Sequence, residues 1–93
     1  MSKFIETPEG WHILTKDLEE QLTDIGCSVI QMKQKFAELR VYYRPVNKQA
    51  DLLIERCNEI CVVTCEICGK PGTSVNDGGL LRIACEEHIR VFS

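Results

Sequence analysis

Two short pairs of metal-binding residues near the C-terminus constrain this sequence more than any other feature. Cys65 and Cys68 are separated by two residues, and Cys85 and His88 repeat that spacing after sixteen further residues. Two intervening residues allow one tight turn to present both donor atoms of a pair to the same ion. Gly69 supplies the backbone freedom with which the chain leaves the first turn. The pattern predicts one Zn²⁺ held by all four side chains.

The residues around these pairs predict a zinc unit over 65–93. The Asn-Asp-Gly-Gly stretch at 76–79 is a turn signal, and the apolar residues at 80–83 read as a short strand. Glu86 would open a last helix, with Cys85 near its positive end, where a thiolate is favoured. The tight turn with Cys65 and Cys68 (the knuckle), the hairpin and the last helix together make a treble-clef-like unit. Because three thiolates and one imidazole fill a tetrahedron, we expect a structural ion.

The first part of the chain predicts a helix over 7–25. Thr7 is placed to cap it, Pro8 suits its first turn, and Gly26 suits a left-handed stop. An apolar stripe recurs at helical spacing along this segment, at Trp11, Leu14, Leu18, Leu22 and Ile25. Helical spacing returns over 48–61, which predicts a second helix.

Between the helices, alternation of apolar and polar residues over 28–46 predicts a β-hairpin. A two-residue connection at Ala37-Glu38 would place Phe36 opposite Leu39 and Met32 opposite Tyr43. One face is then mostly apolar, with Gln34 as an exception, and is formed by Ile30, Met32, Phe36, Leu39, Val41 and Tyr43. The other face gathers Lys33, Lys35, Arg40, Tyr42 and Arg44. The fold class is therefore α+β: helix, hairpin, second helix and zinc unit.

The remaining cysteines and the histidine near the N-terminus lack such a pattern. Cys57 and Cys61 share a helix face and so suit a second metal pair, but they lie on the apolar stripe and we interpret them as core. Cys27 and His12 are interpreted as structural or exposed. The sequence contains no metalloprotease, phosphate-loop or nucleophile-elbow motif. We therefore expect no enzyme activity and no small-molecule substrate.

Length and composition limit the classes of protein to which this chain can belong. A chain of 93 residues is long enough for one domain, which we divide into a helix-hairpin-helix part (1–64) and a zinc-binding part (65–93). No apolar run reaches the roughly 20 residues that cross a bilayer, so no membrane association is expected. The first residues lack the pattern of a secretory signal, which predicts a cytoplasmic location. Six cysteines in that setting favour metal binding over disulfides.

The distribution of charge is compatible with two kinds of partner, a nucleic acid and a protein. Four cations around Tyr42 on the hairpin can contact a phosphate backbone and stack one base of DNA or RNA. The whole chain, however, has a net charge of −3, and an acidic protein is disfavoured as a non-specific nucleic-acid binder. A solvated outer sheet face explains the same residues. The acidic segment 1–26 suits docking to a basic protein surface.

Three stretches of the chain resemble the small zinc-binding proteins of bacteriophages and prophages. They are Gln34-Lys-Phe-Ala-Glu-Leu-Arg-Val-Tyr-Tyr43, Cys65-Glu-Ile-Cys68-Gly-Lys-Pro-Gly72 and Ala84-Cys85-Glu-Glu-His88. The resemblance runs from about Trp11 to His88 and implies the same four ligands. Ala37 stands where that group usually has glycine, which argues against a turn that needs a positive φ there. Cys57 and Cys61 lie outside the group's pattern.

Together these observations predict a non-enzymatic, zinc-stapled accessory protein of phage type. Its small size, its acidity and the resemblance favour binding to a host protein, with inhibition of a defence or nucleic-acid-processing complex as the expected effect. The alternative is a nucleic-acid-binding zinc module that uses the basic hairpin face.

Overall fold

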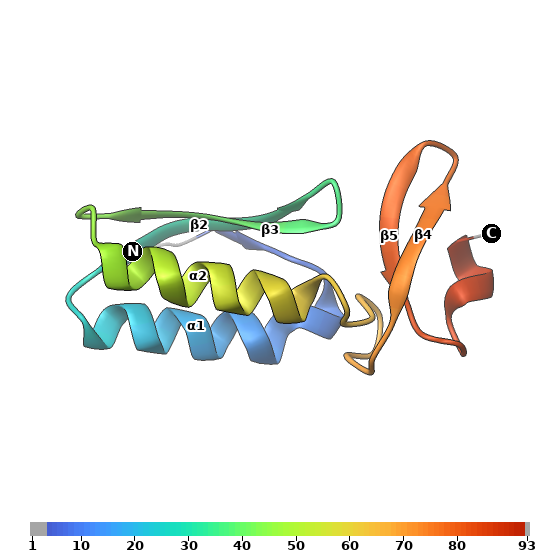
Figure 1. Ribbon diagram of the computed structural model, residues 1–93, viewed down its shortest axis with the longest axis horizontal. Helices are drawn as coiled ribbons and strands as arrows, with labels where there is room; N and C mark the ends of the chain where they lie inside the picture. The colour runs from blue at the N-terminus through green and yellow to red at the C-terminus, as the bar shows by residue number, and fades with distance from the viewer. Residues whose placement is uncertain (1–3, 93) are drawn as a thin grey trace.

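A three-stranded sheet covered on one face by two helices forms most of the molecule, and a small hairpin stands across one end (Figure 1). This computed structural model describes residues 4–92, and it is elongated, with extents of 41 × 20 × 20 Å. In chain order the elements are β1 (Phe4–Glu6), η1 (Glu9–Trp11), α1 (His12–Asp24), β2 (Ser28–Lys35), β3 (Glu38–Arg44), α2 (Lys48–Cys61), β4 (Thr73–Asp77), β5 (Leu80–Ala84) and η2 (Ile89–Phe92). The α+β architecture is the predicted one.

Strand β1 is an element that the sequence pattern does not predict. It pairs in parallel with β2, so that η1 and α1 form the crossover between them. Three residues are too few to show an alternating pattern, and the partner strand begins more than twenty residues later. The pairing therefore depends on how α1 packs against the sheet and not on local sequence.

The hairpin register differs from the predicted one. The turn is formed by Phe36 and Ala37, so that Lys35 pairs with Glu38 and Met32 with Val41 instead of Tyr43. Both turn residues have positive φ, 53° and 63°, as a two-residue turn that follows the strand twist requires. Ala37 thus adopts a positive φ, contrary to the expectation that alanine argues against such a turn. Because the register moves by an even number of residues, most side chains keep their predicted face.

Two residues do leave the predicted apolar face. The β2–β3 ladder is irregular between Val29 and Gln31, so that Val29 turns into the core while Ile30 is 39% exposed. A bulge of this kind adds one residue to one strand and reverses the alternation beyond it. Phe36, displaced into the turn, is 70% exposed. Alternation in the sequence could not reveal either change.

The first helix begins later than predicted. A 3₁₀ turn over Glu9–Trp11 precedes α1, and the Thr7 side chain makes no capping hydrogen bond. Its other end is as predicted: Gly26 has φ +85°, and the N–H groups of Gly26 and Cys27 donate to the carbonyls of Thr23 and Leu22. This pair of bonds is the glycine-dependent Schellman ending.

The second helix spans the predicted residues. Asn47 caps it by accepting hydrogen bonds from the N–H groups of Gln49 and Ala50. The buried core is built from Trp11, Leu18, Leu22, Cys27, Val29, Met32, Ala37, Leu39, Ala50 and Cys61, together with Ile83 of β5. Cys61 is fully buried and Cys57 packs against this cluster, which confirms the core interpretation of that pair.

Within residues 4–92, neither helix is long and apolar enough to span a membrane.

Candidate metal centre

The first ligand pair lies in a tight turn between α2 and β4. The N–H of Cys65 donates to the carbonyl of Lys70 at 2.7 Å, and the N–H of Gly69 donates to the carbonyl of Cys65 at 2.9 Å. Gly69 has φ +83°, the left-handed conformation for which glycine was expected. The turn therefore forms as the Cys-x-x-Cys-Gly spacing predicts.

The second pair is placed by the β4–β5 hairpin. Gly78 and Gly79 make its two-residue loop, and β5 ends at Ala84, directly before Cys85. The N–H groups of His88 and Ile89 both donate to the carbonyl of Cys85, which turns the chain so that His88 faces back. The predicted last helix is shorter than expected: a turn over 85–88 followed by the 3₁₀ helix η2.

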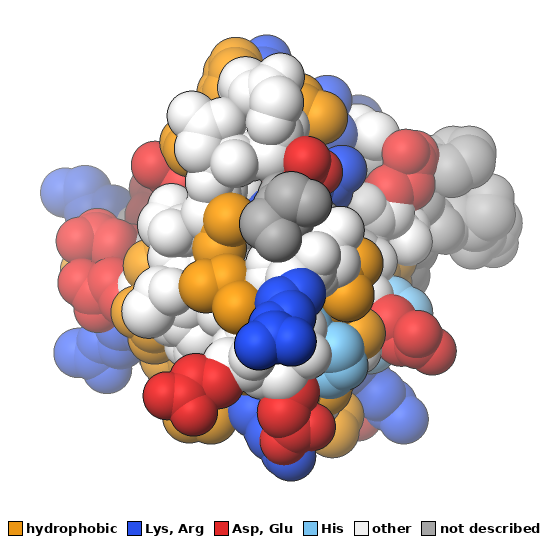
Figure 2. Space-filling view, turned by 90° about the vertical axis from the view of Figure 1, so that its right-hand side faces the viewer, with side chains coloured by type: hydrophobic (Ala, Val, Ile, Leu, Met, Phe, Trp, Pro, Cys, Tyr) orange, Lys and Arg blue, Asp and Glu red, His pale blue; other side chains and the backbone are white. Residues whose placement is uncertain are grey.

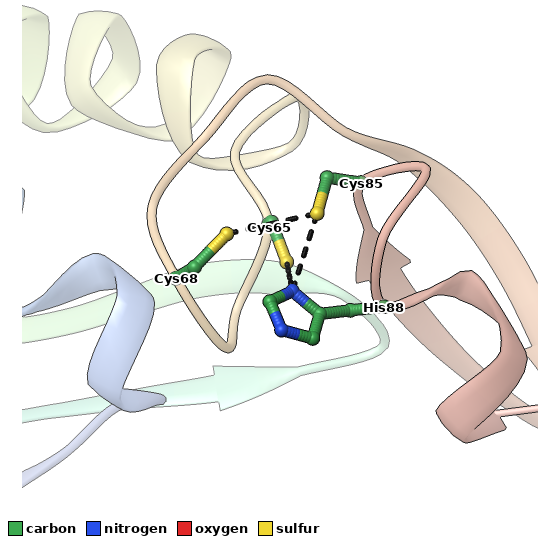
Figure 3. A group of neighbouring side chains, drawn as sticks. All are labelled: Cys65, Cys68, Cys85 and His88. Atoms are coloured by element: carbon green, nitrogen blue, oxygen red, sulfur yellow. Dashed lines mark hydrogen bonds between the residues drawn. The ribbon is translucent and has the colours of Figure 1, made fainter.

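Four donor atoms from these two pairs converge on one point (Figure 3). The Sγ atoms of Cys65, Cys68 and Cys85 and a ring nitrogen of His88 lie within 4.8 Å of one another. Cys68 Sγ is 3.6 Å from Cys85 Sγ, and His88 Nδ1 is 3.7 Å from Cys65 Sγ and 3.2 Å from Cys85 Sγ. Tetrahedral Zn–S and Zn–N bonds imply edges of about 3.5–3.8 Å. Two of the three distances equal such edges and the third is a little shorter, so the four residues form a candidate site for one tetrahedral ion.

The surroundings of the cluster favour the thiolate form of its most buried cysteine. Burial alone raises the pKa of Cys65, but hydrogen bonds from the backbone N–H groups of Cys68, Ile67 and Cys85, together with His88, lower it to about 6. The N–H of Ile67 lies 3.4 Å from Cys65 Sγ. Metal ions bind the thiolate, so these backbone donors prepare the site for a cation.

An ion pair joins the two ligand loops at the surface. Lys70 Nζ, two residues after Cys68, lies 2.9 Å from a carboxylate oxygen of Glu87, next to His88. The pair raises the pKa of Lys70 and lowers that of Glu87. Both side chains are more than half exposed, so the contact adds little stability.

Sequence reasoning missed the role of Glu66, which lies between the first two ligands. Its side chain is buried and bonds away from the cluster: one oxygen accepts from Gln34 Nε2 at 2.8 Å and from the N–H of Ile83 at 3.1 Å. The other oxygen lies 3.1 Å from a guanidinium nitrogen of Arg82. Glu66 thus ties the knuckle to β2 and β5. A charged residue inside a ligand pair is the only sequence signal for it, and that signal does not indicate burial.

A second connection reaches η1. The N–H of Gly10 donates to the carbonyl of Glu66 at 2.8 Å, and Trp11 Nε1 donates to the carbonyl of Thr64 at 2.9 Å. A Cβ at Gly10 would lie 2.1 Å from the carbonyl oxygen of Cys65. The ligand turn therefore packs on η1 at a position that only glycine permits.

The structure places the five predicted contact residues of the hairpin on the outer face of the sheet. Lys33 and Arg40 are cross-strand partners, and Lys33 Nζ lies 5.6 Å from the centre of the Tyr42 ring. Glu6 aligns with Lys33 on β1, and Glu38 lies 3.6 Å from Arg40. Lys35 and Arg44 are exposed. The basic residues thus gather as predicted, with two carboxylates among them.

The structure does not bring His12 and the remaining cysteines into one site. The hollow beside His12 is lined by Ile5, Thr15, Lys16 and Glu19, with no cysteine from the described part of the chain. Cys27 is buried, and its thiol donates to the carbonyl of Pro45 at 3.8 Å. Figure 2 looks onto the end formed by the C-terminal unit, where hydrophobic side chains and charges of both signs are interspersed.

Comparison of the chain with family models, with curated proteins and with solved structures finds no significant match. The functional interpretation therefore depends on the site and surfaces described above.

Proposed function

We propose that Cys65, Cys68, Cys85 and His88 bind one structural Zn²⁺ and that the protein is a non-enzymatic binding module built around it. The convergence of three sulfurs and one imidazole nitrogen within 4.8 Å carries this proposal. Thiolate-rich tetrahedral sets select zinc among the common divalent ions, and four protein ligands leave no position for a substrate or a reactive water.

Metal analysis of the purified protein tests the first half of this proposal. We expect one equivalent of zinc per chain, and Co²⁺ replacement should give the intense sulfur-to-metal absorption of a tetrahedral thiolate site. Cys85→Ser should reduce the bound metal to a small fraction, while Cys27→Ala, which removes a buried thiol outside the cluster, should retain it. Equal zinc content in the two variants would contradict the ligand assignment.

The partner we propose is a protein of a host cell, with inhibition of a defence or nucleic-acid-processing complex as the outcome. The acidic charge favours a protein partner over nucleic acid. The resemblance to phage and prophage proteins bears only on the host-cell setting. Tagged, zinc-loaded protein should retain a bacterial polypeptide from lysate after nuclease treatment. Retention of no polypeptide, with or without nuclease, would count against this part of the proposal.

A nucleic-acid-binding module is the second candidate, and the gathering of Lys33, Lys35, Arg40 and Arg44 on one sheet face favours it. Glu6 and Glu38 reduce the positive potential there, and Lys33 already covers part of the Tyr42 ring. This candidate expects DNA or RNA binding that weakens steeply with salt and is lost in Lys35→Glu/Arg40→Glu. Binding that is absent or insensitive to salt would reject it.

A further inference from the structure

A groove between α1 and α2 is a surface feature that the metal centre does not explain. Its apolar lining includes Leu14, Leu53 and Ile60, and its rim carries Asp17, Gln21 and Arg56. The hollow has a volume of about 220 Å³. We call this feature the interhelical groove.

The interhelical groove continues onto the ligand turn. A second hollow of about 420 Å³ shares Leu14 and Ile60 with it and is also lined by Ile13, Ile67 and Cys68. Ile13 is 84% exposed and Ile60 51% exposed, although both are large apolar side chains. Contiguous exposed apolar surface bounded by polar residues is typical of interaction sites.

The shape of the groove suits a helix. From Gln21 to Ile13 the α1 wall rises about 12 Å, since each helical residue adds about 1.5 Å. That length matches two turns of a partner helix, whose apolar residues at every third or fourth position can contact the groove floor. The lining residues belong to helices, to η1 and to the ligand turn, so strand addition is not the mode of binding here.

Charge distinguishes among possible occupants. On the α1 side Asp17 lines the groove, and Glu9 lines the hollow beside the ligand turn. Glu20 and Asp24 are exposed further along α1, where they line a separate hollow. Among the described residues that line the two hollows, Arg56 is the one basic side chain. Two copies of this chain packed groove to groove would bring Asp17 and Glu9 of both copies onto one interface, which is unfavourable. A partner with basic residues beside its apolar face is complementary.

We propose that the interhelical groove binds a basic amphipathic helix of a partner protein. The apolar face of that helix packs on Leu14, Leu53 and Ile60, and its lysine or arginine side chains pair with Asp17 and Glu9. The inference deepens the proposed function, on which it rests, because it names the surface used and the chemistry of the protein bound.

Three synthetic peptides of equal length test the groove directly. The first is an amphipathic helix with a leucine face and lysine flanks, the second keeps the leucine face with glutamate flanks, and the third is a scramble of the first. Fluorescence anisotropy with zinc-loaded protein should show binding of the first alone. Equal binding of the scrambled peptide would mean that positive charge alone, without an apolar helix face, explains the binding. Equal binding of the acidic peptide would mean that the charge of the partner does not matter. Either result overturns the proposal.

Matched variants on α2 locate the binding surface. Ile60→Asp should weaken binding of the basic peptide by about tenfold or more, because it places a charge on the groove floor. Leu52→Asp makes the same kind of change at an exposed residue of the same helix outside the groove, where Leu52 is 56% exposed, and should leave affinity unchanged. Asp17→Lys should weaken binding of the basic peptide and make that binding less dependent on salt, because it removes a carboxylate from the groove. Glu55→Lys, the same kind of charge reversal at an exposed residue outside the groove, should change neither. Ile13→Asp is the second groove variant if Ile60→Asp loses zinc.

A lysate experiment separates failure of the groove from failure of the proposed function. If wild type and Ile60→Asp retain the same bacterial polypeptide equally, the protein-binding function stands and the groove proposal is wrong. If the wild type binds the basic peptide through the groove but retains no polypeptide, the groove stands and the host-protein proposal fails. Dimers that dissociate in Ile60→Asp would identify a second copy as the occupant and overturn the proposal.

Discussion

At the scale of single residues, Glu66 shows how a ligand turn is attached to the rest of a protein. Both carboxylate oxygens accept hydrogen bonds, from Gln34, from Arg82 and from the N–H of Ile83. These donors come from β2 and β5, so one buried side chain connects the ligand turn to both sheets. Because the carboxylate points away from the four donor atoms, we expect it to position the turn rather than bind metal.

Glu66→Gln is therefore expected to destabilise the zinc-loaded protein by about 1.5–3 kcal/mol. Whichever way the glutamine amide is turned, its NH₂ group replaces a carboxylate oxygen that accepted a hydrogen bond, so two donors face each other. Urea unfolding of the zinc-loaded variant measures this change. Glu87→Gln is the matched control because it makes the same substitution at an exposed carboxylate, and it should have little effect. A Glu66→Gln protein with wild-type stability would show that these bonds contribute nothing net.

At the scale of elements, the hairpin turn carries strain that can be relieved. Phe36 has φ 53° and is 70% exposed, so its ring gains little from burial in exchange for a left-handed backbone. Asparagine tolerates this conformation better and is favoured in two-residue hairpin turns.

Phe36→Asn is expected to stabilise the protein by about 0.5–1 kcal/mol, or a few degrees in Tm. Thermal unfolding followed by circular dichroism checks it. Val46→Asn, at a residue that is 92% exposed and is not among the positive-φ residues, should leave Tm nearly unchanged. A lower Tm for Phe36→Asn would mean that contacts of the Phe36 ring stabilise the folded protein by more than its left-handed backbone conformation destabilises it.

The C-terminal unit is the element that depends most on metal. The β4–β5 hairpin has two strands of five residues each, and the exposed side chains along it include Leu80 and Leu81. A two-stranded hairpin of this size is marginal alone, and structural zinc supplies folding free energy in units of this kind.

Chelation of zinc, or Cys68→Ser, should therefore unfold residues from about 65 onward and expose their amides to hydrogen exchange. The amides of α2 and of the β2–β3 hairpin should stay protected, because their core lies between the helices and the sheet. Unchanged protection at β4 and β5 after metal removal would refute a structural role for the ion.

At the scale of the whole molecule, Gly10 is one of the close contacts between η1 and the ligand turn, so we expect it to affect whether the two parts unfold together. Its N–H bonds the Glu66 carbonyl, and there is no room for a Cβ against the Cys65 carbonyl. Its φ is not among the positive values, so the requirement for glycine comes from close approach and not from backbone conformation.

Gly10→Ala should keep its zinc but lose the cooperative contact between η1 and the ligand turn. We expect unfolding in two steps, or a lower Tm with a broader transition, in differential scanning calorimetry. Glu9→Ala, a change at the adjacent exposed residue, should retain a single transition. A single transition at the wild-type Tm for Gly10→Ala would mean that the ligand turn can shift to accommodate the methyl group without loss of stability.

Local patterns in the sequence were sufficient for the features that depend on neighbouring residues. The ligand spacing identified the four donor side chains, helical periodicity gave the bounds of α2, and Gly26 marked the end of α1. Strand alternation assigned the outer face of β3, because an even shift of register leaves each side chain on the same side. These features are set by local backbone geometry, which a few adjacent residues determine.

Tertiary packing decided the rest. The β1–β2 pairing joins residues more than twenty positions apart, and η1, directly before α1, is bonded through Gly10 to the carbonyl of Glu66. The bulge that exchanges Ile30 for Val29 in the core also has no signal in the alternation of the sequence. The burial of Glu66 and the closeness of Gly10 to Cys65 also bring together residues far apart in the chain. The sequence by itself thus determined which atoms meet at the candidate metal centre. Only the folded chain determined what holds that centre in place, because those contacts form between surfaces that have no local signature.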